Sequence, residues 1–305
     1  MRIIVNGQQA FGKAVLDALI ERGEDVIAVY GPADKDGRVD PLTQAARDHD
    51  LPVYSPKSFK TDEAVEELKI LKPDLGVMAF VTKFCPSNFL DVPTFGTIQY
   101  HPSLLPLHRG PSSINWPIIM GREETGLSIF WPDDGLDEGP ILLQKTVPIG
   151  PDDTLGSIYF DKLFPIGVEA MLEAVDLVRD GKAPKIDQDH SKKTYESWCK
   201  KENVELDWSK PAAEIYNMIR GANPSPGAWS TLDGKVVQIF DAARSDDISG
   251  APGEVTAISD DGISVAAGSG GIVIKRVRYE SKDKIPASDF VSQAGLQAGA
   301  RLGDG

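Results

Sequence analysis

Short β-branched apolar runs alternate with amphipathic helical segments along the first half of this 305-residue chain. Residues 3–5 form the first run, residues 11–22 have apolar side chains at helical spacing, and residues 26–30 form the next run. Because a helix between two such strands usually places them parallel in one sheet, this order predicts an α/β domain with a mostly parallel sheet. The alternation continues with helices expected over residues 41–49, 62–71, 87–90 and 112–120, and strands over residues 53–54, 75–80, 96–100, 126–131 and 141–147.

A long helix is expected over residues 154–181, with Asp153 or Thr154 as its N-cap and a break near Pro165. Residues 187–203 are polar and charged, which is typical of a linker. A further helix is expected from Pro211, capped by Ser209 and ended by Gly221.

Short strand-type runs punctuated by Gly and Asp follow, at residues 236–240, 255–258, 263–266 and 272–277. Such spacing indicates a small β-barrel. We therefore predict two domains, residues 1–203 and residues 204–305, and we expect residues 293–305 to fray.

The turn after the first strand contains Gly7 and Gly12, followed by Lys13 and Ala14. It nearly matches the loop that binds phosphate where a strand turns into a helix. Ala14 stands where that loop needs a hydroxyl group for Mg²⁺, and the glycine spacing of a dinucleotide-binding turn is also missing. A tight turn in which the glycines allow close packing is the favoured interpretation.

The net charge of -14 and the pI of about 4.8 indicate an acidic surface, which repels polynucleotides unless it contains a basic patch. Cys85 and Cys199 form no C-x-x-C pair and no H-E-x-x-H motif occurs, so no metal is expected, and a reducing compartment is favoured. No apolar run approaches the roughly 20 residues that cross a membrane. We expect a cytoplasmic protein without a membrane partner.

His101 is the histidine whose surroundings suggest chemistry. It follows the strand expected over residues 96–100, and ligand sites of open α/β sheets form at the carboxyl ends of strands. Pro102 and Pro106 make the following loop rigid, and an imidazole there can transfer protons near neutral pH. Asp137 lies in an acidic turn between two expected strands, and from its spacing alone it is a solvated hairpin residue.

Residues 96–145 resemble the formyltransferase family. The shared elements are the histidine of an H-x-S-L-L-P segment at a strand end, Arg109-Gly110, Ile114-Asn115-Trp116 and Leu136-Asp137-x-Gly139. The resemblance covers nearly the whole chain and is nearest to the N-terminal hydrolase domain of 10-formyltetrahydrofolate dehydrogenases, through Gly7-Gln8, Asp34-Lys35-Asp36-Gly37, Phe130-Trp131, Leu142-Leu143-Gln144-Lys145, Ile219-Arg220-Gly221 and Pro226-Gly227-Ala228-Trp229.

The resemblance implies a Rossmann-like first domain and a smaller OB-like β-barrel. It implies that His101 and Asp137 are catalytic and that Asp137 and residues 83–85, which are Lys83, Phe84 and Cys85, contact the folate. Transferases of the family have Asn two residues before the histidine and the hydrolase-like relatives have an apolar residue, whereas this chain has Gln99. We expect Gln99 or a backbone N–H to stabilise the oxyanion, and Asp137 to select the tautomer of His101.

The implied activity uses 10-formyltetrahydrofolate as a consumed formyl donor, without a metal. Our main hypothesis is hydrolysis to formate and tetrahydrofolate, or transfer to a small amine. Formylation of methionyl-tRNA is the alternative, and it predicts a basic second domain, yet residues 204–305 contain ten Lys and Arg against fourteen Asp and Glu. On this count tRNA is an unlikely partner. A third hypothesis is a non-catalytic folate-binding module.

Overall fold

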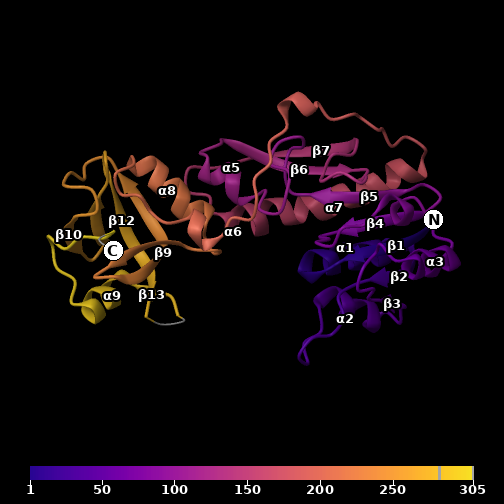
Figure 1. Ribbon diagram of the computed structural model, residues 1–305, viewed down its shortest axis with the longest axis horizontal. Coiled ribbons are helices and arrows are strands. Elements are labelled where there is room, and N and C mark those ends of the chain that lie inside the picture. The colour runs from indigo at the N-terminus through magenta and orange to yellow at the C-terminus, as the bar shows by residue number, and fades with distance from the viewer. Residues whose placement is uncertain (281–282, 304–305) are drawn as a thin grey trace. The chain divides into compact units, whose positions relative to one another are not determined.

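The computed structural model describes residues 1–280 and 283–303. The chain divides into two compact units (Figure 1). Unit 1 comprises Met1–Pro111, Gly126–Val147 and Phe160–Tyr195, and unit 2 comprises Ser112–Thr125, Pro148–Tyr159 and Glu196–Gly305. The domain boundary between residues 203 and 204 stays a prediction.

Unit 1 contains a seven-stranded sheet in the order β3-β2-β1-β4-β5-β6-β7. The first five strands along this order run parallel, and β6 is antiparallel to β5. The predicted Rossmann-like, mostly parallel sheet is therefore confirmed. The strands are β1 (Arg2–Gly7), β2 (Asp25–Tyr30), β3 (Val53–Tyr54), β4 (Leu75–Ala79), β5 (Thr97–His101), β6 (Glu124–Phe130) and β7 (Ile141–Pro148).

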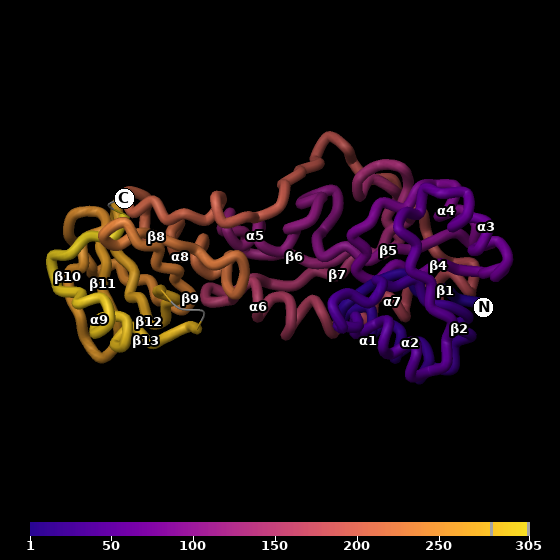
Figure 2. The backbone as a smooth tube through the Cα atoms, turned by 60° about the horizontal axis from the view of Figure 1, so that its bottom comes forward, coloured from indigo at the N-terminus to yellow at the C-terminus, as the bar shows by residue number. Residues whose placement is uncertain are grey.

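Helices cover both faces of this sheet, as Figure 2 shows, with α1, α2 and α7 on one face and α3 and α4 on the other. Alternate residues of the strands face opposite ways, so the buried strands are apolar on both sides. Tyr30 and Met78, for example, pack with Phe59, Leu68 and Phe89 in one core cluster. The helices are α1 (Gln9–Glu21), α2 (Pro41–Asp48), α3 (Asp62–Leu71), α4 (Ser87–Leu90) and α7 (Phe164–Arg179).

The glycine turn between β1 and α1 is a packing turn, as the favoured interpretation has it. A Cβ atom on Gly7 would lie 2.1 Å from the carbonyl oxygen of Ala79. The carboxylate of Asp40 accepts a hydrogen bond from the Gln9 N–H at the start of α1 and another from Leu42 at the start of α2. A carboxylate of the chain thus occupies the place that a phosphate takes in a phosphate-binding loop.

The long helix expected over residues 154–181 is interrupted. It consists of α6 (Leu155–Ser157), a π-helical turn (Ile158–Leu163) and α7, which begins one residue before Pro165. A proline at the start of α7 costs no helical hydrogen bond. Thr154 caps α6 in a capping box with Ser157, as one of the two predicted caps.

The segment predicted to be a linker is ordered against unit 1 in its first part, and that prediction is wrong there. Ile186 pairs with Ile141 and Tyr195 with Arg109 as isolated β-bridges. Between them lies the short 3-10 helix His190–Lys192, and a second one, Lys201–Asn203, follows in unit 2. Polar composition does not identify a linker here because the polar side chains bind backbone groups of unit 1, as described below.

Unit 2 is the smaller unit, built on an antiparallel sheet in the order β10-β11-β12-β9-β8, with β13 paired to β12. The predicted second, β-barrel-like domain is confirmed as this separate sheet. Its strands are β8 (Ala228–Leu232), β9 (Lys235–Ser245), β10 (Val255–Ser259), β11 (Gly262–Ala266), β12 (Gly271–Tyr279) and β13 (Ile285–Pro286). Its helices are α5 (Asn115–Ile119), α6 (Leu155–Ser157), α8 (Ala212–Gly221) and α9 (Ala287–Ala294).

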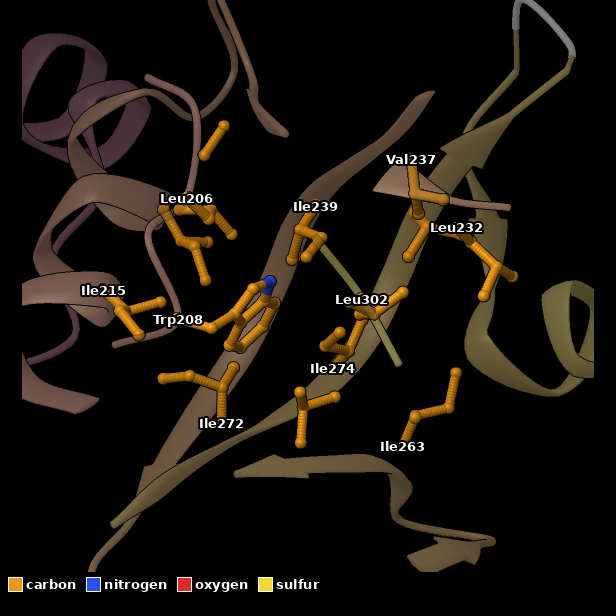
Figure 3. Packing of buried hydrophobic residues seen from close by; sticks show 14 of the residues in the cluster. Leu206, Trp208, Ile215, Leu232, Val237, Ile239, Ile263, Ile272, Ile274 and Leu302 are labelled. Atoms are coloured by element: carbon orange, nitrogen blue, oxygen red, sulfur yellow. The ribbon is translucent and has the colours of Figure 1, made fainter. Parts of the chain in front are cut away.

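The core of unit 2 gathers side chains from the sheet, from α8 and from the C-terminal stretch, as Figure 3 shows for Trp208, Ile215, Ile239, Ile272 and Leu302. Leu302 is only 2% exposed, so this part of the segment that we expected to fray is packed into the core of unit 2. The Gly303 N–H also donates to the Thr231 carbonyl. Residues 304–305 lie outside the described residues.

Ser209 does not cap α8, contrary to prediction. Its hydroxyl donates to Asp207, and α8 follows Pro211 without a side-chain cap. None of the described helices is long and apolar enough to cross a membrane.

Candidate active site

His101 is the last residue of β5, and its side chain is 7% exposed. Its Nε2 atom lies 3.0 Å from the carbonyl oxygen of His108. Because a carbonyl oxygen only accepts, Nε2 of His101 carries the proton in this hydrogen bond. The neutral ring then has its free lone pair on Nδ1.

Asp137 faces that second ring nitrogen. The Oδ2 atom lies 3.7 Å from Nδ1 of His101, and the carboxyl side chain is 9% exposed. The same oxygen accepts the N–H of Gly110 at 2.9 Å. The gap between Asp137 and His101 is longer than a hydrogen bond. We expected Asp137 to select the tautomer of His101; in the structure the carbonyl of His108 does so.

Three residues that form or hold the His101–Asp137 pair have backbone φ angles in the left-handed region. Asp137 has φ 53°, His108 has φ 53° and Gly110 has φ 99°. Such angles are uncommon for residues other than glycine and persist where the surrounding contacts hold them. His108 is held by its N–H, which donates to Thr194 Oγ1 at 2.8 Å. The Thr194 carbonyl also accepts from the N–H of Arg109.

A second loop reaches the turn that contains Asp137. The N–H of Ser87, at the start of α4, donates to Oδ1 of Asp134 at 2.9 Å. The backbone and side chain of Ser87 hold the pKa of the Asp134 carboxyl below its usual value. Residues 83–86 immediately precede Ser87, so they lie at the same end of the sheet as the turn that contains Asp137.

The three residues expected to contact folate have different surroundings. Nζ of Lys83 donates to the Pro56 carbonyl, and the residue lines an open recess at the ends of β1, β2 and β4. Phe84 is half-exposed, with Nζ of Lys60 4.8 Å from its ring centre. Cys85 is buried in the core cluster with Tyr30, where burial raises the pKa of its thiol to about 12.

Gln99 lies on β5 between Met78 of β4 and Phe130 of β6, and it is half-buried. Residues two apart on a strand point to the same face, so its side chain lies on the face of His101. Its carboxamide makes no hydrogen bond to another residue within 1–280 or 283–303. It is therefore free to bind a substrate atom.

The structure thus brings His101 and Asp137 together and leaves Gln99 beside them. The partners that hold this pair, which are His108, Gly110 and Thr194, were not among the expected site residues. Their contacts involve backbone atoms or residues distant in the sequence, for which no local pattern exists. Among the described residues, no group of three or more His, Cys, Asp or Glu side chains could hold a metal.

With this geometry established, comparison with known proteins shows the family. The formyl transferase family model matches residues 1–175, and the model of the formyl transferase C-terminal domain matches residues 199–295. The chain belongs to the formyl transferase family. The two models also follow the division into a mostly parallel α/β part and a smaller β part.

Two curated relatives illustrate how the match extends. The mitochondrial 10-formyltetrahydrofolate dehydrogenase of Mus musculus is 40% identical over 306 residues, which is 96% of this chain and 33% of that protein. The chain thus spans about a third of the length of that relative. The methionyl-tRNA formyltransferase of Geobacter sulfurreducens is 38% identical over 310 residues, which is 100% of this chain and 97% of that protein.

A solved structure supports the fold. HypX from Aquifex aeolicus, crystallised with tetrahydrofolic acid, superposes with a TM-score of 0.69 at 22% identity, covering 96% of this chain and 47% of HypX.

Proposed function

We propose that this protein transfers the formyl group of 10-formyltetrahydrofolate to a nucleophile at the end of β5. The observation that carries the proposal is the approach of His101 Nδ1 and Asp137 Oδ2 to 3.7 Å in a nearly buried position. A buried base that faces a carboxylate is suited to remove a proton from an attacking nucleophile, because the carboxylate stabilises the imidazolium that forms. A non-catalytic folate-binding module would need neither group.

The proposed reaction begins with attack of the nucleophile on the formyl carbon. Nδ1 of His101 takes the proton from the nucleophile, while Nε2 stays bound to the carbonyl of His108. The carbonyl oxygen of the formyl group becomes an oxyanion, which a carboxamide N–H of Gln99 stabilises. The tetrahedral intermediate then collapses, the bond to N10 breaks, and the proton on His101 passes to the departing nitrogen.

The folate is proposed to lie along the loops that Ser87 and Asp134 join. Lys83 and Phe84 precede Ser87 and are exposed, so both can contact a ligand. Cys85 is buried, and its Sγ accepts from Asn6. We therefore assign its part in folate binding to shaping the loop rather than to direct polar contact.

As the acceptor we propose the amino group of methionyl-tRNA. This is favoured by the match to the Geobacter sulfurreducens methionyl-tRNA formyltransferase, which covers both proteins almost completely. The excess of acidic residues in residues 204–305 gives only a net charge and does not exclude a local basic surface.

Water is the second candidate acceptor, with formate and tetrahydrofolate as products, and a small amine would use the same site. The match to the mouse 10-formyltetrahydrofolate dehydrogenase, at 40% identity over 96% of this chain, favours this candidate. Gln99 matches neither the Asn of transferases nor the apolar residue of hydrolase-like relatives, so this position favours neither acceptor.

One experiment tests the function and separates the acceptors. The purified protein is incubated with 10-formyltetrahydrofolate alone and with added methionyl-tRNA, and formate, tetrahydrofolate and formylmethionyl-tRNA are measured. Formylmethionyl-tRNA formed faster than formate supports the tRNA acceptor. Equal formate release with and without tRNA supports water. If no tetrahydrofolate forms with water, methionyl-tRNA or a panel of small amines, the proposed function is wrong.

A further inference from the structure

Gln188 lies in the polar segment between Ile186 and Tyr195, yet it is only 6% exposed, whereas its neighbours Asp187 and Asp189 are exposed. Its carboxamide makes three hydrogen bonds. Nε2 donates to the carbonyl of Asp137 at 2.9 Å and to the carbonyl of Gly139 at 2.7 Å. Oε1 accepts from Nη2 of Arg109 at 2.6 Å. Both N–H groups of the side chain therefore bind the turn that contains Asp137.

The orientation of this carboxamide is determined by its partners. A guanidinium only donates and a backbone carbonyl only accepts, so the oxygen must face Arg109 and the nitrogen must face the turn. A side chain at position 188 needs two donors and one acceptor in this arrangement. Glutamine meets that requirement, and an ionised glutamate of the same size does not.

Arg109 connects Gln188 to two further side chains, those of Glu138 and His190. It is 2% exposed, and Nη1 donates to Glu138 at 2.8 Å while Nη2 lies 3.3 Å from Nδ1 of His190. A buried guanidinium is costly unless it is paired and hydrogen-bonded, so its partners constrain one another. The residue after Arg109 is Gly110, whose N–H binds the carboxylate of Asp137.

We propose that Gln188 is a positioning residue for the formyl-transfer reaction, an inference that rests on the proposed function. Its two N–H groups hold the main chain on either side of residue 138, which keeps Asp137 at φ 53°. Gly110 holds the carboxylate end of the same residue. The two restraints together keep Asp137 Oδ2 opposite His101 Nδ1.

The test uses two variants with a matched control. Gln188→Glu keeps the size and the acceptor for Arg109 but removes both donors, and Gln188→Leu removes all three bonds. The control is Gln238→Leu in unit 2, because Gln238 also accepts from an arginine, Arg278, and donates to a carbonyl, that of Pro226. For each protein, kcat and KM for 10-formyltetrahydrofolate and the melting temperature are measured.

Both Gln188 variants are expected to lose about 10–100-fold in kcat, because a displacement near 1 Å of a catalytic group has an effect of this size. KM is expected to stay within about twofold, because Gln188 contacts no proposed folate-binding loop other than the turn of Asp137. Gln238→Leu should keep kcat within about twofold of the wild type. Gln188→Asn, with the same groups on a shorter chain, should recover part of the rate.

The inference is overturned if Gln188→Glu retains the wild-type kcat. It is also overturned if the fall in kcat matches the loss of folded protein and the control Gln238→Leu shows the same fall. A wild-type protein that does not turn over 10-formyltetrahydrofolate refutes the proposed function instead. In that event the positioning claim is tested by hydrogen exchange of the backbone amides of residues 133–139. Faster exchange in Gln188→Glu than in the wild type supports the claim, and unchanged exchange overturns it.

Discussion

His101 donates its Nε2–H to the carbonyl oxygen of His108, seven residues further along the same loop. The carbonyl of His108 therefore determines the tautomer of His101, so Asp137 is expected to act only through its charge. Asp137 lies on the opposite side of the ring, 3.7 Å from Nδ1. This division of roles leads to separate predictions for the two side chains.

His101→Ala should abolish most turnover of 10-formyltetrahydrofolate and leave binding of a reduced folate largely intact. A general base acts in the transition state, and its removal typically lowers the rate by roughly 10²–10⁴-fold. Steady-state kinetics and titration calorimetry with a folate analogue measure the two effects. Full activity of His101→Ala would remove the histidine from the mechanism.

Asp137→Asn should retain the fold and lose at least about tenfold in kcat. The asparagine oxygen can still accept from the N–H of Gly110, so the turn keeps its place, but the charge that stabilises an imidazolium is gone. The melting temperature serves as the control for folding. A wild-type rate in this variant would mean that Asp137 is only a turn residue.

Gln99→Leu should lose about 2.7–4 kcal/mol of transition-state stabilisation, which is the usual effect of removing one oxyanion donor. Gln99→Asn should keep much of the rate, because it retains a carboxamide on the same strand face. Folate affinity should change little in both variants. If Gln99→Leu is as fast as the parent, the donors to the oxyanion are backbone N–H groups.

Buried Cys85 should make the protein less stable in alkaline solution. Its pKa is about 12 in the folded protein against 9 as its ordinary value, since burial disfavours the thiolate. Unfolding therefore releases a proton above pH 9, so the stability contribution is complete below pH 9 and is lost as the pH rises toward 12. The free energy of unfolding should fall by up to about 1.4 kcal/mol per pH unit from this group.

Urea unfolding between pH 8 and pH 10.5 measures that slope. In Cys85→Ala the alkaline decline should be shallower, even though the variant is less stable at pH 7 because a cavity replaces the thiol. An identical slope in the variant and the parent would show that the thiol ionises equally in both states.

Sequence pattern predicted the strands and helices of unit 1 well because each has a strong local signal. The runs of β1, β2 and β4 are apolar on both faces, as buried parallel strands must be. The antiparallel direction of β6 was not predicted, because direction depends on the path of the connecting segment rather than on the strand itself. The strand β8 and the helix α9 were missed because they are short, and polar residues interrupt their apolar residues.

The residues of the candidate site also divide into those with a local sequence signal and those without one. His101 could be found because a histidine at a strand end between prolines is a local feature, and Asp137 through the resemblance to a family. Gln188 could not be found, because it lies 51 residues from Asp137 in the chain and its sequence neighbours are solvent-exposed aspartates. Its role depends on a tertiary contact to backbone carbonyls, for which polar composition predicts a linker instead.

In the proposed mechanism His101 and Asp137 carry out the removal of the formyl group from the folate, and the fate of a labelled formyl group tests this step. The wild type, His101→Ala and Asp137→Asn are each incubated with 10-formyltetrahydrofolate that carries a radiolabel in the formyl group, together with methionyl-tRNA, and the label is separated into folate, formate and tRNA fractions. We expect label to leave the folate in the wild type, with one tetrahydrofolate formed per formyl group transferred. In the two variants we expect almost all of the label to stay on the folate. Label that stays on the folate with the wild type, or that leaves equally fast in all three proteins, would contradict the proposed mechanism.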